Sequence, residues 1–228
     1  MGNIALKFSQ QFCPYPCLLM KKEEKQTALV QIRDEIASCF DCPLSKTRTN
    51  TVPGEGDPNA EIMFIGEAPG QTEDQLGIPF CGRAGEFLNQ MLSTIGLKRE
   101  DVFIANTCKC RPPENRDPLP EEKAACKKYL NKQFEIIDPK IIVCLGKHSV
   151  ETFLPTAGGI SKVHGKPFRR KDGKVYLPLY HPAAALHNGG LRQTLLDDFA
   201  IIPALLKKIS AEPKNIENKI EIKQETLI

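Results

Sequence analysis

Four short apolar runs, each followed by a stretch with helical periodicity, constrain the fold of this chain more than any other feature. The runs cover residues 61–66, 101–106, 140–146 and 174–180. Helical patterns follow over about 83–95, 120–137 and 191–208, with a short helix from Lys147, and another helix comes first at 25–38. Strands that alternate with helices form a parallel sheet with helices on both faces. We therefore expect an α/β protein.

The 228 residues are enough for one such domain, which we place at residues 25–209. Residues 1–24 show no clear period and read as a disordered N-terminal extension, and Met20 could itself be the start of translation. Residues 210–228 are polar and read as a flexible tail. No apolar run approaches the ~20 residues that span a bilayer, and no secretory signal is visible. We expect no membrane contact and a cytoplasmic location.

Polar or small residues mark the carboxyl ends of the predicted strands. Glu67, Asn106, Gly146 and His181 each lie at or just beyond such an end. Ligands of open α/β sheets bind at this edge. The sequence therefore predicts a binding site there.

The nine cysteines point to a metal centre rather than to a set of disulfides. Cys39 and Cys42 form a C-x2-C pair at the end of the first helix, and Cys110 and Cys126 follow much later. Four thiolates suit either a [4Fe–4S] cluster or tetrahedral zinc, and spacing alone does not decide between them. The remaining cysteines we expect to be bystanders, with Cys144 a small core residue.

Positive charge is more informative in its distribution than in its net value of +3. Residues 162–174 are locally very basic, and Lys109, Arg111 and Arg116 cluster around a cysteine. Such patches attract phosphate backbones. A solvated basic face is the equally good alternative.

A set of motifs in a fixed order links the chain to a known family. Together they closely resemble the family-4 uracil-DNA glycosylases, thermostable members of which carry a [4Fe–4S] cluster. The resemblance extends from about Ser38 to Leu206. The matching segments are Ile65–Gly70, Glu73-Asp74, Gly77–Phe80, Gly82–Gly85, Asn106, Lys109–Pro118 and His181–Leu186.

The resemblance implies a three-layer α/β/α sandwich with a central four-stranded parallel sheet. It also implies a [4Fe–4S] cluster on Cys39, Cys42, Cys110 and Cys126, with a structural role. The expected activity is hydrolysis of the N-glycosidic bond of uracil in single- or double-stranded DNA, during base excision repair. We expect a monomer that associates with the nucleoid of a bacterium or archaeon.

A glycosylase must extrude its base and bind it in a pocket, and the chain has a candidate for each task. Phe80 can stack on the flipped ring, a contact worth ~1–3 kcal/mol per base. The carboxamide of Asn106 can bond both an imide N–H and a carbonyl oxygen, and Gly66 belongs to the same substrate-binding set. His181 can donate to uracil O2 as charge develops on the departing base.

The carboxylate that stabilises the sugar and orients water is less clear from the motifs. The superfamily's best-known branch reads Gly-Gln-Asp-Pro-Tyr, where the Asp positions water and the Tyr excludes thymine. This chain has Ala68 and Gly70 at those positions. Glu67 and Glu73 are therefore the catalytic candidates, although Glu67 could mainly shape the pocket and Glu73 could cap the next segment. The barrier against thymine is unassigned.

Two further contacts are expected outside the pocket. Leu186 or His187 could wedge into the space that the flipped nucleotide leaves in DNA. The terminal segment from Gln224 to Ile228 resembles the short peptides by which bacterial repair proteins dock on the sliding clamp. The alternative is a tail whose last two residues happen to be apolar.

Two other functions would use some of the same residues. A non-catalytic nucleic-acid-binding module needs the cysteines and basic patches, but not Phe80, Asn106 and His181 together at strand ends. An electron carrier needs no base-sized pocket. Release of uracil from an oligonucleotide would separate these hypotheses.

Overall fold

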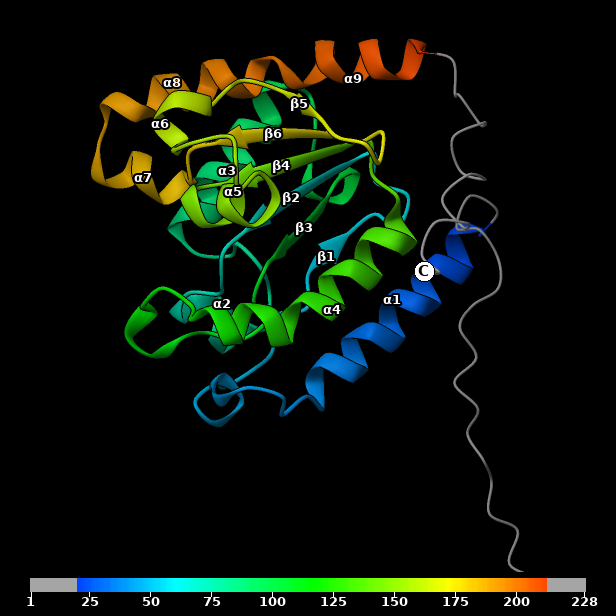
Figure 1. Cartoon of the computed structure of the whole chain (residues 1–228), viewed down its shortest axis with the longest axis vertical. Coiled ribbons are helices and arrows are strands. Elements are labelled where there is room, and N and C mark those ends of the chain that lie inside the picture. The colour runs from blue at the N-terminus through cyan, green and yellow to red at the C-terminus, as the bar shows by residue number, and fades with distance from the viewer. Residues whose placement is uncertain (1–19, 213–228) are drawn as a thin grey trace, which may run out of the picture.

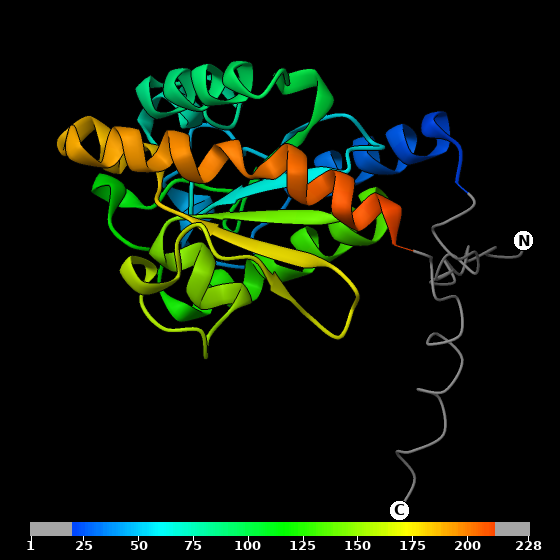
Figure 2. The ribbon, with the colours of Figure 1, turned by 90° about the horizontal axis from the view of Figure 1, so that it is seen from above.

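The computed structural model describes residues 20–212, which form a six-stranded sheet between two layers of helices (Figures 1 and 2). Three of the expectations fall outside this range. They concern most of the N-terminal extension, two of the cysteines expected to be bystanders (Cys13 and Cys17), and the clamp-binding segment at the C-terminus.

The centre of the sheet is the four-stranded parallel arrangement that was predicted. The strands lie in the order β3-β2-β4-β6, and each neighbouring pair is parallel. Two-residue strands add one antiparallel edge on each side, next to β3 and β6. Such short strands have no periodicity that a sequence could reveal. The bounds are β1 Glu55–Gly56, β2 Ile62–Gly66, β3 Phe103–Asn106, β4 Ile141–Leu145, β5 Phe168–Arg169 and β6 Val175–Leu179.

The main helices lie where the apolar periodicity placed them, with two corrections. The first helix starts at Lys22, inside the segment expected to be an extension. The helix expected at 191–208 is two helices that meet at Ile201, where Pro203 in the first turn of the second has no amide hydrogen to continue the first. The bounds are α1 Lys22–Ala37, α2 Gln71–Leu76, α3 Arg83–Thr94, α4 Pro120–Ile137, α5 Lys147–Phe153, α6 Ile160–Val163, α7 Pro182–His187, α8 Gly190–Ala200 and α9 Ile202–Ala211.

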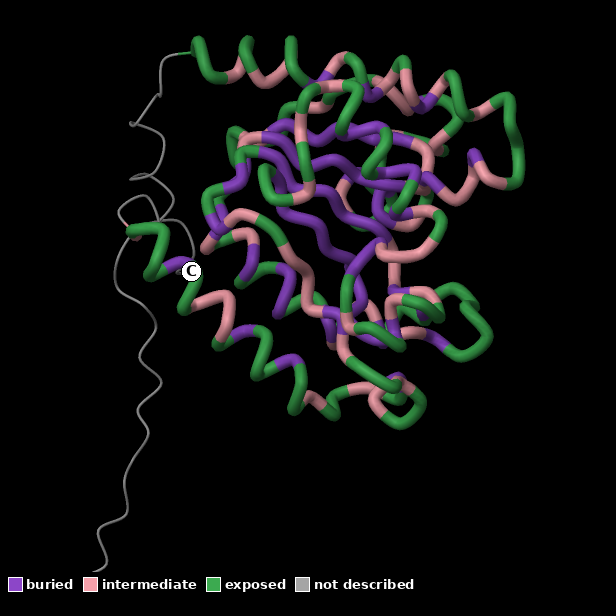
Figure 3. The backbone as a smooth tube through the Cα atoms, turned by 180° about the vertical axis from the view of Figure 1, so that it is seen from behind, coloured by how far each residue is buried: buried purple, intermediate pink, exposed green. Residues whose placement is uncertain are grey.

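The strands are buried on both faces, as Figure 3 shows along their length. Side chains alternate between the faces of a strand, so each strand contributes to two cores. Phe64 packs toward α3 and α8, while Met63 and Ile65 pack toward α4 and α5. Cys144 is completely buried in the second core, which confirms its expected role as a small apolar residue.

Helix α1 packs against α4 on the outside of the molecule (Figure 1). Their contact is a small apolar cluster in which Ile32 and Ile36 meet Cys126 and Tyr129. This packing brings the end of α1, and the C-x2-C pair that follows it, next to α4. Among the described helices, none is both long and apolar enough to cross a membrane.

The sheet has a switch point between β2 and β4. From β2 the chain continues to β3 on one side, and from β4 it continues to β6 on the other. Loops at the carboxyl ends of these two strands therefore diverge and leave a crevice. Glu67 follows β2 and Gly146 follows β4, so the predicted site residues lie at this crevice.

Candidate functional site

A cavity of about 340 Å³ opens at this edge of the sheet. Five of the residues predicted from the sequence line it together, although they come from three separate stretches of the chain, at 67–80, 106 and 181. The cavity is closed by the loop after β3 and by α7. Its predicted lining residues are Glu67, Glu73, Phe80, Asn106 and His181, and its additional ones include Pro112, Asn115, Arg116 and Ala183.

Phe80 forms one wall of the cavity. Its side chain is buried, and its ring stacks on that of His181 with centroids 5.5 Å apart and an interplanar angle of 27°. Gly66 makes room for this arrangement. A Cβ at Gly66 would lie 2.6 Å from Phe80 Cζ and 2.4 Å from Asn106 Oδ1, so any side chain there would displace both.

The backbone of Phe80 is held in an uncommon conformation, with φ of +49°. Arg99 donates to the carbonyl oxygens of Phe80 (3.1 Å) and Pro79 (2.6 Å). The backbone of α3 comes so close that a Cβ at Gly85 would lie 1.6 Å from the Phe80 carbonyl oxygen. The sequence did not reveal Arg99, because it lies 19 residues away, outside every recognised motif.

Asn106 presents an unused acceptor inside the cavity. Its side chain is 2% exposed, and its Oδ1 has no hydrogen-bond partner within the described part of the chain. An unpaired buried oxygen is costly, on the order of 1–3 kcal/mol. The carboxamide therefore has the character of a group that awaits a donor from a ligand.

His181 is fixed in one tautomer by its own helix. It caps α7, where its Nδ1 accepts a hydrogen bond from the backbone N–H of Ala183 at 3.1 Å. Burial lowers the pKa of His181 to about 4, because a charged ring is disfavoured among apolar neighbours. We assign the neutral ring with its proton on Nε2, which leaves one N–H available as a donor.

Glu67 is half-buried and also has an unused atom. Its Oε1 forms no hydrogen bond with any described residue, and Nε2 of His148 lies 3.4 Å away from it. Burial raises the pKa of Glu67, and the neighbouring His148 works in the opposite direction. His148 itself carried no signal in the sequence, since it lies in no motif.

Glu73, the other candidate carboxylate, is fully engaged by the backbone. One oxygen accepts from the N–H of Gly70 at 3.1 Å. The other accepts from Cys81 at 3.1 Å and Gly82 at 2.9 Å. Glu73 thus joins the start of α2 to the start of α3 and braces the intervening loop that carries Phe80.

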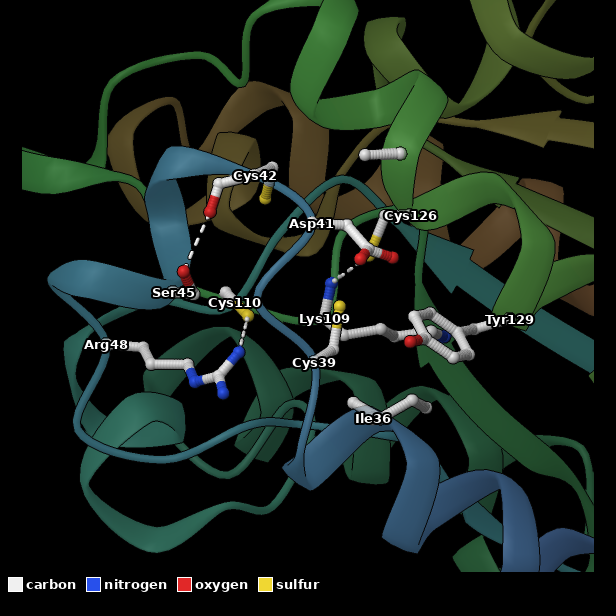
Figure 4. Close-up of a pocket in the computed structure, with 11 residues that line it drawn as sticks. Ile36, Cys39, Asp41, Cys42, Ser45, Arg48, Lys109, Cys110, Cys126 and Tyr129 are labelled. Carbon is white, nitrogen blue, oxygen red and sulfur yellow. Dashed lines mark hydrogen bonds between the residues drawn. The ribbon is translucent and has the colours of Figure 1, made fainter. Parts of the chain in front are cut away.

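The four predicted cysteines converge on a second pocket (Figure 4). Cys39 and Cys42 come from the loop after α1, Cys110 from the loop after β3, and Cys126 from α4. Their sulfur atoms face a common space, which Tyr129 borders from one side. The other described cysteines, at positions 81, 108 and 144, do not line it.

Donors and charge around these sulfur atoms fit a thiolate-bound metal centre. The backbone N–H of Lys109 donates to Cys126 Sγ at 3.2 Å, and Arg48 Nη1 donates to Cys110 Sγ at 3.3 Å. Burial raises the pKa of Cys126 to about 11, so the bare thiolate would be disfavoured. A bound cationic centre would remove that penalty, and N–H···S bonds of this kind tune such centres.

Lys109 belongs to the basic cluster for which the sequence left two interpretations, attraction of phosphate or a solvated basic face, and for Lys109 both are wrong. The side chain is only 1% exposed, and its Nζ donates to the carbonyl oxygen of Asn106 and to Gln133 Oε1 at 2.9 and 2.8 Å. It ties the end of β3 to α4 from inside the fold. Arg116 lines the cavity, but both of its terminal guanidinium nitrogens, Nη1 and Nη2, donate to the carboxylate of Glu122.

Leu186 and His187 lie on α7 and do not line the cavity. His187 is exposed and Leu186 is partly exposed. The basic segment 162–174 is also largely exposed, on the side of β6. These residues remain available to a partner outside the cavity.

Known proteins resemble this chain over most of its length. The family model described as "Uracil DNA glycosylase superfamily" matches residues 53–200. The type-4 uracil-DNA glycosylase of Sulfurisphaera tokodaii is 50% identical over 186 residues, which are 78% of this chain and 84% of that protein. The type-4 enzyme of Archaeoglobus fulgidus is 48% identical over 79% of this chain and 94% of its own length. The type-5 uracil-DNA glycosylase of Thermus thermophilus is more distant, with 32% identity over 57% of this chain and 68% of that protein.

Proposed function

This chain belongs to the uracil-DNA glycosylase superfamily and, within it, to the type-4 enzymes, and from this membership we infer what its cavity does. It binds a uracil that has been flipped out of DNA and hydrolyses the N-glycosidic bond. The products are free uracil and an abasic site, the first step of base excision repair. The observation that carries the assignment of roles is the pair of unsatisfied oxygens, Asn106 Oδ1 and Glu67 Oε1, in one cavity.

Base recognition rests on Asn106 and Phe80. The free Oδ1 of Asn106 accepts the N3–H of uracil, while its amide group donates to a ring carbonyl. Cytosine has an acceptor at N3 and an amino donor at C4, so it would oppose both contacts. Phe80 stacks on the base and is already held in place by Arg99.

His181 stabilises the leaving group. As the bond breaks, negative charge develops on uracil, and the neutral ring donates its Nε2–H to O2 of the base. The bond is stronger in the transition state than in the ground state, which is the condition for catalysis. Because the pKa of His181 is about 4, the ring acts as a hydrogen-bond donor rather than as a cation at neutral pH.

We assign Glu67 a catalytic role at the sugar and Glu73 a structural role in the loop that carries Phe80. Positive charge develops on the deoxyribose as uracil departs, and a carboxylate beside it lowers the barrier and orients the attacking water. Glu67 has a free oxygen for this purpose. Both carboxylate oxygens of Glu73 already accept hydrogen bonds, from three backbone N–H groups in total, and this supports a structural role.

Cys39, Cys42, Cys110 and Cys126 would hold a [4Fe–4S] cluster. The relatives of this chain are type-4 uracil-DNA glycosylases, and the convergence of four sulfur donors in one pocket supports the cluster. When bound, it supplies structural cross-linking rather than electron transfer. Three segments would be joined by it: the end of α1, the loop after β3, and α4.

Further contacts with partners complete the proposal. Leu186 and His187, at the exposed end of α7, would fill the gap that the flipped nucleotide leaves in DNA. The C-terminal segment with Gln224, Leu227 and Ile228 would dock on a sliding clamp and hold the enzyme near newly copied DNA. The enzyme would act as a monomer on nucleoid DNA in the cytoplasm.

The direct test is release of uracil from a single-stranded oligonucleotide under single-turnover conditions. We expect cleavage by the purified chain and strong impairment of Glu67→Gln and Asn106→Asp. Glu73→Gln should lose thermal stability as well as rate, because it loosens the loop. If Glu67→Gln cleaved as fast as the unmodified chain, the assignment of the carboxylate would be wrong.

A further inference from the structure

His148 is the one group near Glu67 whose position the proposed reaction does not yet explain. It lies in the first turn of α5, directly after β4, and its side chain is 17% exposed. Its Nε2 lies 2.9 Å from Asp117 Oδ2 and 3.4 Å from Glu67 Oε1. Its Nδ1 lies 3.3 Å from Glu151 Oε2. One imidazole ring therefore connects three acidic side chains.

The ring meets these acidic groups chiefly through Nε2. This atom lies between Asp117 Oδ2 and Glu67 Oε1, whereas Nδ1 has no hydrogen-bond partner among the described residues. A protonated ring places a donor and a positive charge beside both carboxylates. Around it, Glu67 follows β2, Asp117 lies in the loop after β3, and Glu151 lies on α5 itself. Lys123 on α4 is the other charged group that acts on Glu67.

Glu67 needs such a neighbour to do its work. A carboxylate can stabilise a cationic sugar only when it is ionised, and burial of Glu67 favours the neutral acid. The positive charge of a protonated His148, 3.4 Å from Glu67 Oε1, favours the ionised form. The side chain of Asp117 is 70% exposed, and its Oδ2 lies 2.9 Å from the same Nε2 atom of His148. Asp117 therefore contacts the ring from the solvent side.

We propose that His148 is a positioning residue for the glycosylase reaction, which keeps Glu67 ionised and oriented toward the sugar. Asp117 and Glu151 fix the ring, and Glu67 alone contacts the substrate. This inference rests on the proposed function of Glu67. It adds a residue whose charge, rather than its contact with DNA, matters for the rate.

The test is a double-mutant cycle between Glu67→Gln and His148→Gln, read as single-turnover cleavage rate against pH. Glutamine retains a donor but has no charge. In His148→Gln the acidic limb of the profile should move to higher pH, because the ionised Glu67 has lost its counter-charge. A shift of one unit would lower the rate about tenfold on that limb, with DNA binding unchanged.

In the Glu67→Gln background the same change at His148 should cost almost nothing, since its target is gone. His164→Gln is the matched control: His164 also contacts a carboxylate, at 2.7 Å from Asp198, but it does not line the cavity that contains Glu67. It should leave the pH profile unchanged. Thermal unfolding of each variant checks that the fold persists.

The outcomes separate the two claims. If Glu67→Gln is impaired and the His148→Gln loss is the same in both backgrounds, His148 acts independently of Glu67 and the inference is overturned. An unshifted pH profile in His148→Gln would overturn it as well. If Glu67→Gln is not impaired at all, the proposed role of Glu67 fails instead.

Discussion

The cavity that Phe80, Asn106 and His181 line (the base cavity) and the pocket of the four cysteines (the cysteine pocket) lie on the same scaffold but differ in what holds their side chains in place. In the base cavity, protein atoms already hold the side chains: Arg99 fixes the Phe80 loop, and the backbone of α7 fixes the His181 tautomer. In the cysteine pocket the four thiols sit on three segments, and no described cysteine is in a disulfide. In the first site, hydrogen bonds from the protein position each side chain, whereas in the second the sulfur atoms of separate segments face a common space.

Residues 106–126 contribute to the lining of both sites. Asn106 ends β3 in the base cavity, and Cys110 lies in the cysteine pocket four residues later. Residues 112–116 return to the cavity wall, and Cys126 closes the path on α4. In the proposed roles, catalysis and cross-linking are thus divided between the two sites, and a cluster on Cys110 and Cys126 would hold both ends of the loop that shapes the cavity. Variants should therefore separate rate from stability.

His181→Ala should have the largest effect and should lower the cleavage rate far more than it weakens DNA binding. Loss of one donor to a developing charge costs on the order of 10²–10³-fold in cleavage. Binding to uracil-containing DNA should change far less, because the bond strengthens only in the transition state. Single-turnover cleavage and equilibrium binding measure the two. An equal loss in both would mean that His181 contacts the ground state and would weaken the division between the pockets.

Cys110→Ser and Cys126→Ser should affect the cysteine pocket and lower iron content and thermal stability. We expect about four irons per chain and a broad absorbance near 400 nm in the anaerobically purified protein, with both lost in these variants. Metal binding contributes to folding free energy, and ~3 kcal/mol would correspond to a fall in Tm of about 10 °C. Iron analysis and thermal unfolding provide the measurements.

Cys144→Ser is the control for these variants, since Cys144 lies in the core and lines neither pocket. It should retain the iron. A colourless protein with stoichiometric zinc would show that the four sulfur atoms hold a different metal.

Arg99→Gln tests whether the base cavity depends on its backbone support. With the bonds to Phe80 and Pro79 lost, the ring should no longer be held in stacking position. Misplacement of a positioning group can cost up to about 10²-fold, and we expect about tenfold in the cleavage rate here. Iron content should be unchanged. Loss of iron would show that the two pockets are mechanically coupled through the sheet edge.

The smallest effect concerns pH and stability. The pKa of His181 is about 4 in the folded chain against 6.5 for the ordinary side chain, so the unfolded chain takes up a proton first as the pH falls. His181 therefore costs stability progressively between pH 6.5 and pH 4 and contributes nothing to the pH dependence above that range. Thermal unfolding at pH 7 and pH 5 should show a smaller decline in His181→Gln than in the unmodified chain. Equal declines would contradict the buried neutral ring.

Much of the fold and of the lining of both pockets could be predicted from the sequence, because those features leave local patterns. Apolar runs identify β2, β3, β4 and β6, and the C-x2-C pair identifies a ligand loop. Residues that follow strand ends must meet at one edge, which is why Glu67, Asn106 and His181 converge. A pattern within one segment was sufficient in each of these cases.

Features that depend on contacts between distant segments could not be predicted. Arg99 and His148 act through partners on other elements, and nothing in their own neighbourhood marks them. Lys109 looked like a surface base because it lies among other basic residues, yet α4 covers it and Gln133 pairs with it. Glu73 had two open roles until its three backbone donors were located.

The two glycines that border Phe80 have a consequence for how this enzyme can evolve. At Gly66 and Gly85 the space for a single methyl group is already occupied by the Phe80 ring or its carbonyl oxygen. Even alanine at either position would displace Phe80 into the cavity. Neither glycine can therefore be substituted unless the neighbouring residues change as well. In a mutational library selected for uracil removal, both positions should therefore return glycine alone, while exposed positions such as Glu100 accept many residues. The shape of the cavity, and with it the specificity, therefore depends on the absence of a Cβ atom at these two positions.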